Sequence, residues 1–198
     1  MVSAMGRIVG VYLVDLEKVR GAVGSGDDLL RRRIEVWFGA DFDRSDKEAG
    51  SSADPTARES LRAVIDGGPY RDGHGHCYAA AYQNICGYYA SWESAHGPYH
   101  RDWLSEVDDA LYRLGIHDIG LTAFEDGPAT PLPWIFDGGY GEWSHDDCVR
   151  AAMASDAMSA GVYAGLDGAL REWVDIALEW ARVAAARPGY GLAGFFTI

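Results

Sequence analysis

The chain has 198 residues, 48% of them hydrophobic, and 30 Asp and Glu residues against 17 Lys and Arg residues give it a formal net charge of −13. This composition is typical of one folded domain, and the charge argues against nucleic acid and membrane partners, since both attract clustered Lys and Arg. We find no apolar run near the ~20 residues of a membrane-spanning helix and no signal-peptide pattern. Three cysteines without CxxC spacing, Cys77, Cys86 and Cys148, are typical of reduced thiols, so we expect a cytoplasmic protein.

The first predicted element is a strand over 7–14, where a nearly continuous apolar run rich in β-branched residues is typical of a strand buried on both faces. A helix beginning near Asp28 follows a short helix and a glycine-rich turn. Its Leu30, Ile34 and Trp37 recur at the spacing of one helix face, so we expect all three in the core.

Two polar stretches come next. The three arginines at 31–33 are flanked by carboxylates, and we interpret them as a solvated helix face. Residues 39–53 offer almost nothing to bury, so we expect a mobile loop there. Helical patterns resume with Asp54 as the N-cap and Pro55 in the first turn, and again over 76–89.

The second half opens with a predicted helix over 101–114, followed by a predicted strand over 119–124. Prolines and glycines then exclude regular structure up to Ser144. Ser144 and Asp147 form the pattern of a capping box, which begins another helix.

The clearest helix is predicted over 166–186, where apolar residues recur at steps of four and three. The chain closes with an apolar strand over 191–198, which must be paired, since an exposed apolar edge aggregates. Pairing it with the strands at 7–14 and 119–124 gives a small sheet covered by helices. We therefore expect an α+β fold, helix-rich, as a single domain over 1–198.

The Gly-His-Gly-His-Cys stretch at 73–77 is the first candidate for chemistry. A glycine-rich loop leading into a helix presents free backbone N–H groups and the positive end of the helix dipole. Both would stabilise a thiolate at Cys77, with His76, His117 or His145 as its base. The alternative is that Cys77 is an inert buried thiol at a helix start.

Histidines could also bind a metal ion. His74 and His76 alternate, but no third ligand accompanies them at a diagnostic spacing. His96 and His100 are four residues apart, yet a Gly-Pro pair between them breaks the helix that would align them. The sequence therefore predicts no metal site and no cofactor.

The Pro- and Gly-rich segment over 125–147 mixes carboxylates with large aromatic residues, and binding loops often have this position between elements. Such a loop could hold a sugar, an amine or a partner's arginine through cation–π and ion-pair contacts. Alternatively, the aromatic residues only anchor the loop itself. The candidate binding residues are Trp134, Asp137, Tyr140, Glu142 and Trp143.

Motifs of the common nucleotide-binding and hydrolytic enzymes are missing from the sequence: it has no P-loop, Rossmann fingerprint, GxSxG elbow or EF-hand loop. Most nucleotide-dependent enzymes are therefore set aside.

Five segments carry a family resemblance: residues 11–15, 77–86, 103–108, 131–143 and 191–196. On these the chain resembles a family of small actinobacterial proteins that share a domain of unknown function. More distantly, the first strand, the long last helix and the closing strand resemble the YfbM-like bacterial proteins. The resemblance implies an α+β fold, and no catalytic residue comes with it.

Two functional hypotheses follow. In the first, the protein is a binding or protein-interaction module, of an immunity or regulatory kind, whose acidic surface engages a basic protein. In the second, it is a small enzyme of specialised metabolism that acts on a small molecule in a pocket near 73–77 and 125–147. Cys77 would be its nucleophile, or His74, His76 and His145 would transfer protons.

Overall fold

The computed structural model describes residues 7–50, 54–100, 102–125, 127, 131–133 and 139–197. Its backbone divides into two compact units. We call the first the sheet unit; it comprises Met1–Leu16, Ser91–Pro128 and Gly139–Ile198. The second, the helical unit, comprises Glu17–Ala90 and Ala129–Gly138. A single domain over 1–198 stays a prediction.

The sheet unit contains a four-stranded antiparallel sheet with the strand order β2-β1-β4-β3. Its strands are β1 (Arg7–Val14), β2 (Trp92–Tyr99), β3 (Tyr140–Trp143) and β4 (Gly191–Thr197). The two central strands, β1 and β4, pair without a register shift from Ile8–Thr197 to Val14–Gly191. The α+β fold and the paired N- and C-terminal strands expected from the sequence are therefore confirmed.

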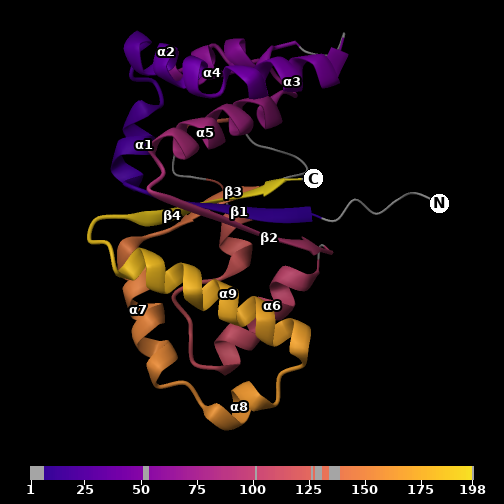
Figure 1. The fold of residues 1–198 in the computed structure, drawn as a ribbon, viewed down its shortest axis with the longest axis vertical. Helices are drawn as coiled ribbons and strands as arrows, with labels where there is room; N and C mark the ends of the chain where they lie inside the picture. The colour runs from indigo at the N-terminus through magenta and orange to yellow at the C-terminus, as the bar shows by residue number, and fades with distance from the viewer. Residues whose placement is uncertain are drawn as a thin grey trace, which may run out of the picture. The chain divides into compact units, whose positions relative to one another are not determined.

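Three helices lie together on one side of this sheet (Figure 1), namely α6 (Trp103–Arg113), α7 (His145–Asp156) and α9 (Gly168–Ala185). The short elements η2 (Leu121–Glu125) and α8 (Ala160–Ala164) complete the unit. The apolar stripe predicted for the last helix is confirmed, because Trp173, Ala177 and Trp180 of α9 are all buried.

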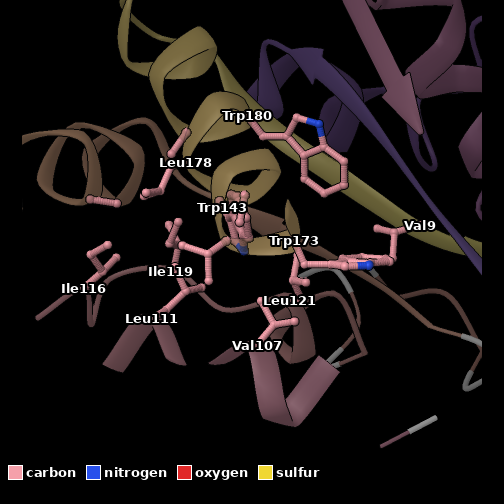
Figure 2. Packing of buried hydrophobic residues seen from close by; sticks show 14 of the residues in the cluster. Val9, Val107, Leu111, Ile116, Ile119, Leu121, Trp143, Trp173, Leu178 and Trp180 are labelled. Carbon is pink, nitrogen blue, oxygen red and sulfur yellow. The ribbon is translucent and has the colours of Figure 1, made fainter. Parts of the chain in front are cut away.

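The core of the sheet unit forms where α6 and α9 meet the sheet (Figure 2). Trp143 of β3 is 2% exposed; its ring stacks on Phe124, with centroids 4.7 Å apart, and meets Trp180 of α9 at 6.5 Å. Its indole Nε1–H donates a hydrogen bond of 2.9 Å to the Gly120 carbonyl. This bond satisfies the polar atom that Trp brings into a core.

The helical unit packs α2 (Asp28–Trp37), α3 (Gly39–Ala49), α4 (Ala57–Asp66) and α5 (Gly75–Tyr89) against one another, and includes all but the first residue of α1 (Leu16–Ala22). The turn after α1 lies against the end of α4: Gly24 N–H donates to the Val64 carbonyl at 2.9 Å. Gly67 ends α4 with a φ of +77°, and a Cβ there would lie 3.1 Å from the Cα of Gly24. Glycine at position 67 therefore allows both the left-handed backbone conformation and the close approach of Gly24.

The strand predicted over 119–124 is wrong, because residues 121–125 form the 3₁₀ helix η2. The carboxylate of Asp108 on α6 accepts hydrogen bonds from the backbone N–H groups of Leu121 and Thr122, at 2.6 and 3.0 Å. These contacts cap a helical turn and leave no ladder of free donors for a sheet. The sheet instead takes β3, inside a segment where we expected no regular structure, and β2, which we did not predict.

The loop expected over 39–53 is wrong for its first part, because α3 occupies Gly39–Ala49, while residues 51–53 lie outside the described residues. Phe42 is the one buried residue of α3, and the Arg58 guanidinium lies over its ring at 5.7 Å. Arg58 also pairs with Asp43 at 2.7 Å. One aromatic anchor and these ties to α4 hold a helix whose composition is otherwise polar.

Candidate functional site

The 73–77 stretch leads into α5 as predicted. His74 occupies the N-cap without a side-chain capping bond, and Gly75 begins the helix. The phenol oxygen of Tyr78 accepts the backbone N–H of Arg71 at 2.8 Å, which fixes the loop to the helix. His76 Nε2 lies 3.3 Å from Cys77 Sγ. The structure thus brings one histidine and the thiol into hydrogen-bond distance.

The electrostatic surroundings of Cys77 oppose an activated thiolate. Partial burial raises the pKa of the Cys77 thiol, and the negative charge of Asp46 on α3 raises this pKa further. A backbone N–H at the helix start acts in the opposite direction but is the smallest of the three effects. The thiol is therefore protonated at neutral pH, which disfavours nucleophilic attack.

His145 belongs to the sheet unit, as the first residue of α7, whereas Cys77 belongs to the helical unit. Its Nδ1 is buried and has no hydrogen-bond partner among the described residues. The neighbouring capping box is confirmed: Ser144 Oγ accepts the Asp147 N–H at 3.1 Å, and Asp147 Oδ2 accepts the Ser144 N–H at 3.1 Å. His145 is thus the first residue of a helix that a capping box begins.

The candidate binding residues of the 125–147 segment do not form one exposed loop. Trp134 and Asp137 lie outside the described residues, while Tyr140, Glu142 and Trp143 belong to β3. Tyr140 is 5% exposed and stacks on Phe195 of β4, with centroids 6.0 Å apart. Strand pairing buries the rings of both Tyr140 and Trp143, and their role as binding residues stays a prediction. Glu142 is half-buried.

The negative charge of the chain is concentrated in the sheet unit. This unit contains 17 Asp and Glu residues against 7 Lys and Arg residues, which leaves −10 of the total of −13. Two neighbouring helices, α6 and α9, each expose a row of carboxylates at helical spacing, and we call them the acidic helix pair. These carboxylates belong to Asp102, the N-cap of α6, to Glu106 and Asp109 on α6, and to Glu172, Asp175 and Glu179 on α9.

A hollow of about 470 Å³ opens on the acidic helix pair. It is lined by Glu106, Asp109, Tyr112 and Arg113 of α6 and by Leu170 of α9. The Tyr112 side chain is 68% exposed, and within the described residues neither Glu106 nor Asp109 has an ion-pair partner. The sequence reasoning missed this surface, although Tyr112 stands off the apolar stripe of its helix and two carboxylates precede it by helical steps.

The described residues contain no group of three or more His, Cys, Asp or Glu side chains arranged to hold a metal ion. None of the helices in the described ranges combines the length and the hydropathy that a membrane crossing requires. Cys77, Cys86 and Cys148 are all free thiols.

The fold and these surfaces define an α+β protein with an acidic helical face on its sheet unit. The chain belongs to the family of the domain of unknown function DUF7691, whose model matches residues 5–197. Neither the search of curated proteins nor the search of solved structures gave a match.

Proposed function

We propose that this protein is a cytoplasmic binding module, of an immunity or regulatory kind, whose acidic helix pair engages a basic protein. The observation that carries the proposal is the net charge of −10 on the sheet unit. Complementary charge accelerates association and selects among partners. An actinobacterial origin and a likeness to YfbM-like proteins stay predictions beside it.

The hollow on α6 has the chemistry to receive a basic side chain. A partner's Lys or Arg placed there would meet the Glu106 and Asp109 carboxylates and the exposed ring of Tyr112. Carboxylates bind a guanidinium through charge-assisted hydrogen bonds, and an aromatic face adds a cation–π contact. Both carboxylates lack an ion-pair partner in the described part of the chain, so no existing pair has to break.

The arginines of α9 do not neutralise this surface. Arg171 Nη2 donates to the carbonyls of Ala164 and Leu166, at 3.2 and 2.9 Å, and Arg182 Nη2 donates to Ser155 Oγ at 2.9 Å. Both guanidinium groups therefore donate to the segment that runs from α7 through α8, while the carboxylates of α9 remain exposed.

The test is affinity capture from an extract of the source cells, with the full chain as bait. At roughly 50 mM salt we expect a basic protein to be retained, and at about 0.5 M salt we expect its release, because salt screens exposed charges. The double variant Glu106→Gln/Asp109→Asn should bind the captured protein at least about 10-fold more weakly. The matched control, Asp66→Asn/Asp72→Asn, removes two exposed charges from the helical unit and should bind like the wild type.

A captured protein that is acidic, or binding that survives 0.5 M salt and is the same for both double variants, would contradict the proposal. Circular dichroism of each variant establishes that a loss of binding is not a loss of fold.

The second candidate function is a small enzyme that uses the Cys/His stretch at 73–77, and the 3.3 Å contact between His76 Nε2 and Cys77 Sγ favours it. Labelling with iodoacetamide between pH 6 and pH 10 tests it. An enzyme nucleophile would be labelled faster near neutral pH than the same thiol in urea, and His76→Ala would slow the reaction. The raised pKa of Cys77 instead predicts slow labelling that accelerates only above its ordinary pKa of 9.0.

A further inference from the structure

The helical unit contains a pocket that none of the sequence motifs indicated. Its volume is about 580 Å³, within the range of small-molecule sites. The walls come from three places in the chain: Lys18 of α1, Arg33 and Trp37 of α2, and Tyr88 and Tyr89 at the end of α5. Two cations and three aromatic rings therefore converge on one hollow.

Arg33 differs from the two arginines that precede it in α2. Its two neighbours in the arginine run are paired: Arg31 with Asp28 and Glu35, and Arg32 with Asp28 at 2.8 Å. Arg33 is exposed and has no ion-pair partner among the residues that the structure describes. The interpretation of the whole run as a solvated face therefore fits its first two members, while the third lines the pocket.

Lys18 lines the same pocket and adds a second positive charge. Its Nζ lies 4.4 Å from the centroid of the Tyr89 ring, so the ammonium group is held over an aromatic face at the pocket surface. The remaining charged residue of the lining, Asp27, has Oδ1 occupied as the N-cap acceptor of the Leu30 N–H at 2.9 Å. Two cations against one carboxylate make the pocket locally positive on a negatively charged chain.

Trp37 is the exposed member of the aromatic lining, whereas Tyr88 and Tyr89 are half-buried. The prediction that Trp37 lies in the core is wrong, because its side chain is 72% exposed. Only Leu30 and Ile34 of the predicted stripe are buried. The Trp37 ring meets Tyr88 edge to face at 6.2 Å, and Tyr88 meets Tyr89 at 5.2 Å. A flat apolar ligand that covered the exposed indole of Trp37 beside these two tyrosine rings would remove apolar surface from water, which is favourable.

We propose that this pocket binds a small aromatic carboxylate. The carboxylate would pair with the Arg33 guanidinium, which suits its planar geometry, and with the Lys18 ammonium group. The aromatic ring would pack on Trp37 and Tyr88 and remove their apolar surface from water. Charges farther than about 8 Å from the pocket are screened at physiological salt, so the cations of the lining favour an anionic ligand.

The test is isothermal titration calorimetry of the full chain with indole-3-acetate and with 4-hydroxyphenylacetate. We expect saturable 1:1 binding of at least one of these carboxylates. Indole, which has no carboxylate, and tryptamine, which carries an ammonium group instead, should both bind at least about 10-fold more weakly. Arg33→Gln and Trp37→Leu should each weaken carboxylate binding by about 10-fold or more.

The matched control is Arg32→Gln, which removes the same charge from the adjacent position of α2, where the side chain pairs with Asp28 and does not line the pocket. It should leave the affinity within about 2-fold of the wild type. Absence of saturable binding for both carboxylates overturns the proposal, as does equal binding of indole or tryptamine, or an Arg33→Gln variant that binds like the wild type. Thermal melts show that each variant is folded.

Discussion

Asp108 of α6 accepts two hydrogen bonds from Thr122 of η2, one from the backbone N–H at 3.0 Å and one from the Oγ1 hydroxyl at 2.5 Å. The same carboxylate accepts the Leu121 N–H at 2.6 Å. A Cβ at Gly120 would lie 2.8 Å from Asp108 Oδ2, so only glycine lets the chain pass this close. One side chain thus determines both the path and the conformation of the segment that carries Phe124 into the core.

Replacement of Asp108 by Asn should lower the free energy of unfolding by about 2 kcal/mol, because the amide has only one acceptor oxygen for three donors. Urea unfolding followed by tryptophan fluorescence measures this, since Trp143, Trp173 and Trp180 lie in the core of the same unit. The control Asp109→Asn changes the exposed neighbour and should cost less than about 0.5 kcal/mol. Equal losses for the two variants would contradict the assigned role of Asp108.

The stability contribution of Asp108 should depend on pH with a definite sign. Burial raises the pKa of Asp108 above its ordinary value of 3.8, and together with the negative charge of Asp109 it outweighs the hydrogen bonds from Thr122 and Leu121, which lower this pKa. Between 3.8 and the raised pKa, the folded chain therefore holds a proton that the unfolded chain has released. The difference in unfolding free energy between the wild type and Asp108→Asn should fall as the pH rises through this window, and then become constant. A difference that grows with pH there would show a lowered pKa instead.

Gly141 of β3 leaves no space for a side chain. A Cβ there would collide with the Ala123 carbonyl oxygen and lie 2.7 Å from the Phe124 Cα, both backbone atoms that cannot rotate away. Gly141→Ala should therefore destabilise the protein by about 3 kcal/mol, the upper part of the range for overpacking. Differential scanning calorimetry should show this as a lower Tm.

The matched control is Gly10→Ala in β1 of the same sheet, where an added Cβ meets nothing within 4 Å. This change should leave the free energy of unfolding nearly unchanged, since there is space for the methyl group and alanine lowers the conformational entropy of the unfolded chain. Similar Tm values for the Gly141→Ala and Gly10→Ala variants would exclude close packing of β3 on η2 as a determinant of stability.

Ser144→Ala should cost about 1 kcal/mol, because it removes the acceptor of the Asp147 N–H from the capping box of α7. The comparison variant Ser105→Ala sits inside α6 on its exposed face and should be neutral or slightly stabilising, since alanine favours the helix. Chemical denaturation curves of the two variants give both values. A smaller loss for Ser144→Ala than for Ser105→Ala would contradict the assignment of the cap.

Local patterns in the sequence were sufficient for several elements. The β-branched run of β1, the apolar stripe of α9 and the Ser144–Asp147 capping box are each written in consecutive residues, and the structure contains all three. Contacts with the rest of the fold do not change the type of these elements, because local propensity and hydrophobic periodicity indicate the same structure.

The errors fall where distant contacts decide the local structure. Residues 119–124 have strand composition, but the Asp108 carboxylate, more than ten residues earlier, stabilises a helical turn. The helix α3 has one buried residue, Phe42, and depends on Arg58 of the next helix. The strand β2 contains a Gly-Pro pair, which an edge strand tolerates and a central strand does not.

The candidate sites divide in the same way. The sequence placed His76 beside Cys77 because they are neighbours, and the structure shows their contact. It did not indicate that Trp37, Tyr88 and Lys18 meet around Arg33, because these residues come from three helices. A pocket assembled from separate elements leaves no pattern in any single segment of the sequence.

The pairing of β1 with β4 joins strands from nearly opposite ends of the chain, with Ile8 opposite Thr197. During synthesis, β1 therefore has no central partner until residues 191–197 have been made, whereas the helices of the helical unit contact one another within the stretch 17–90. Contacts of such long sequence separation form slowly, because the connecting loop must first lose entropy. We expect the helical unit to acquire structure first on the ribosome and the sheet to form last, with the unpaired edge of β1 as the surface most exposed to aggregation until then.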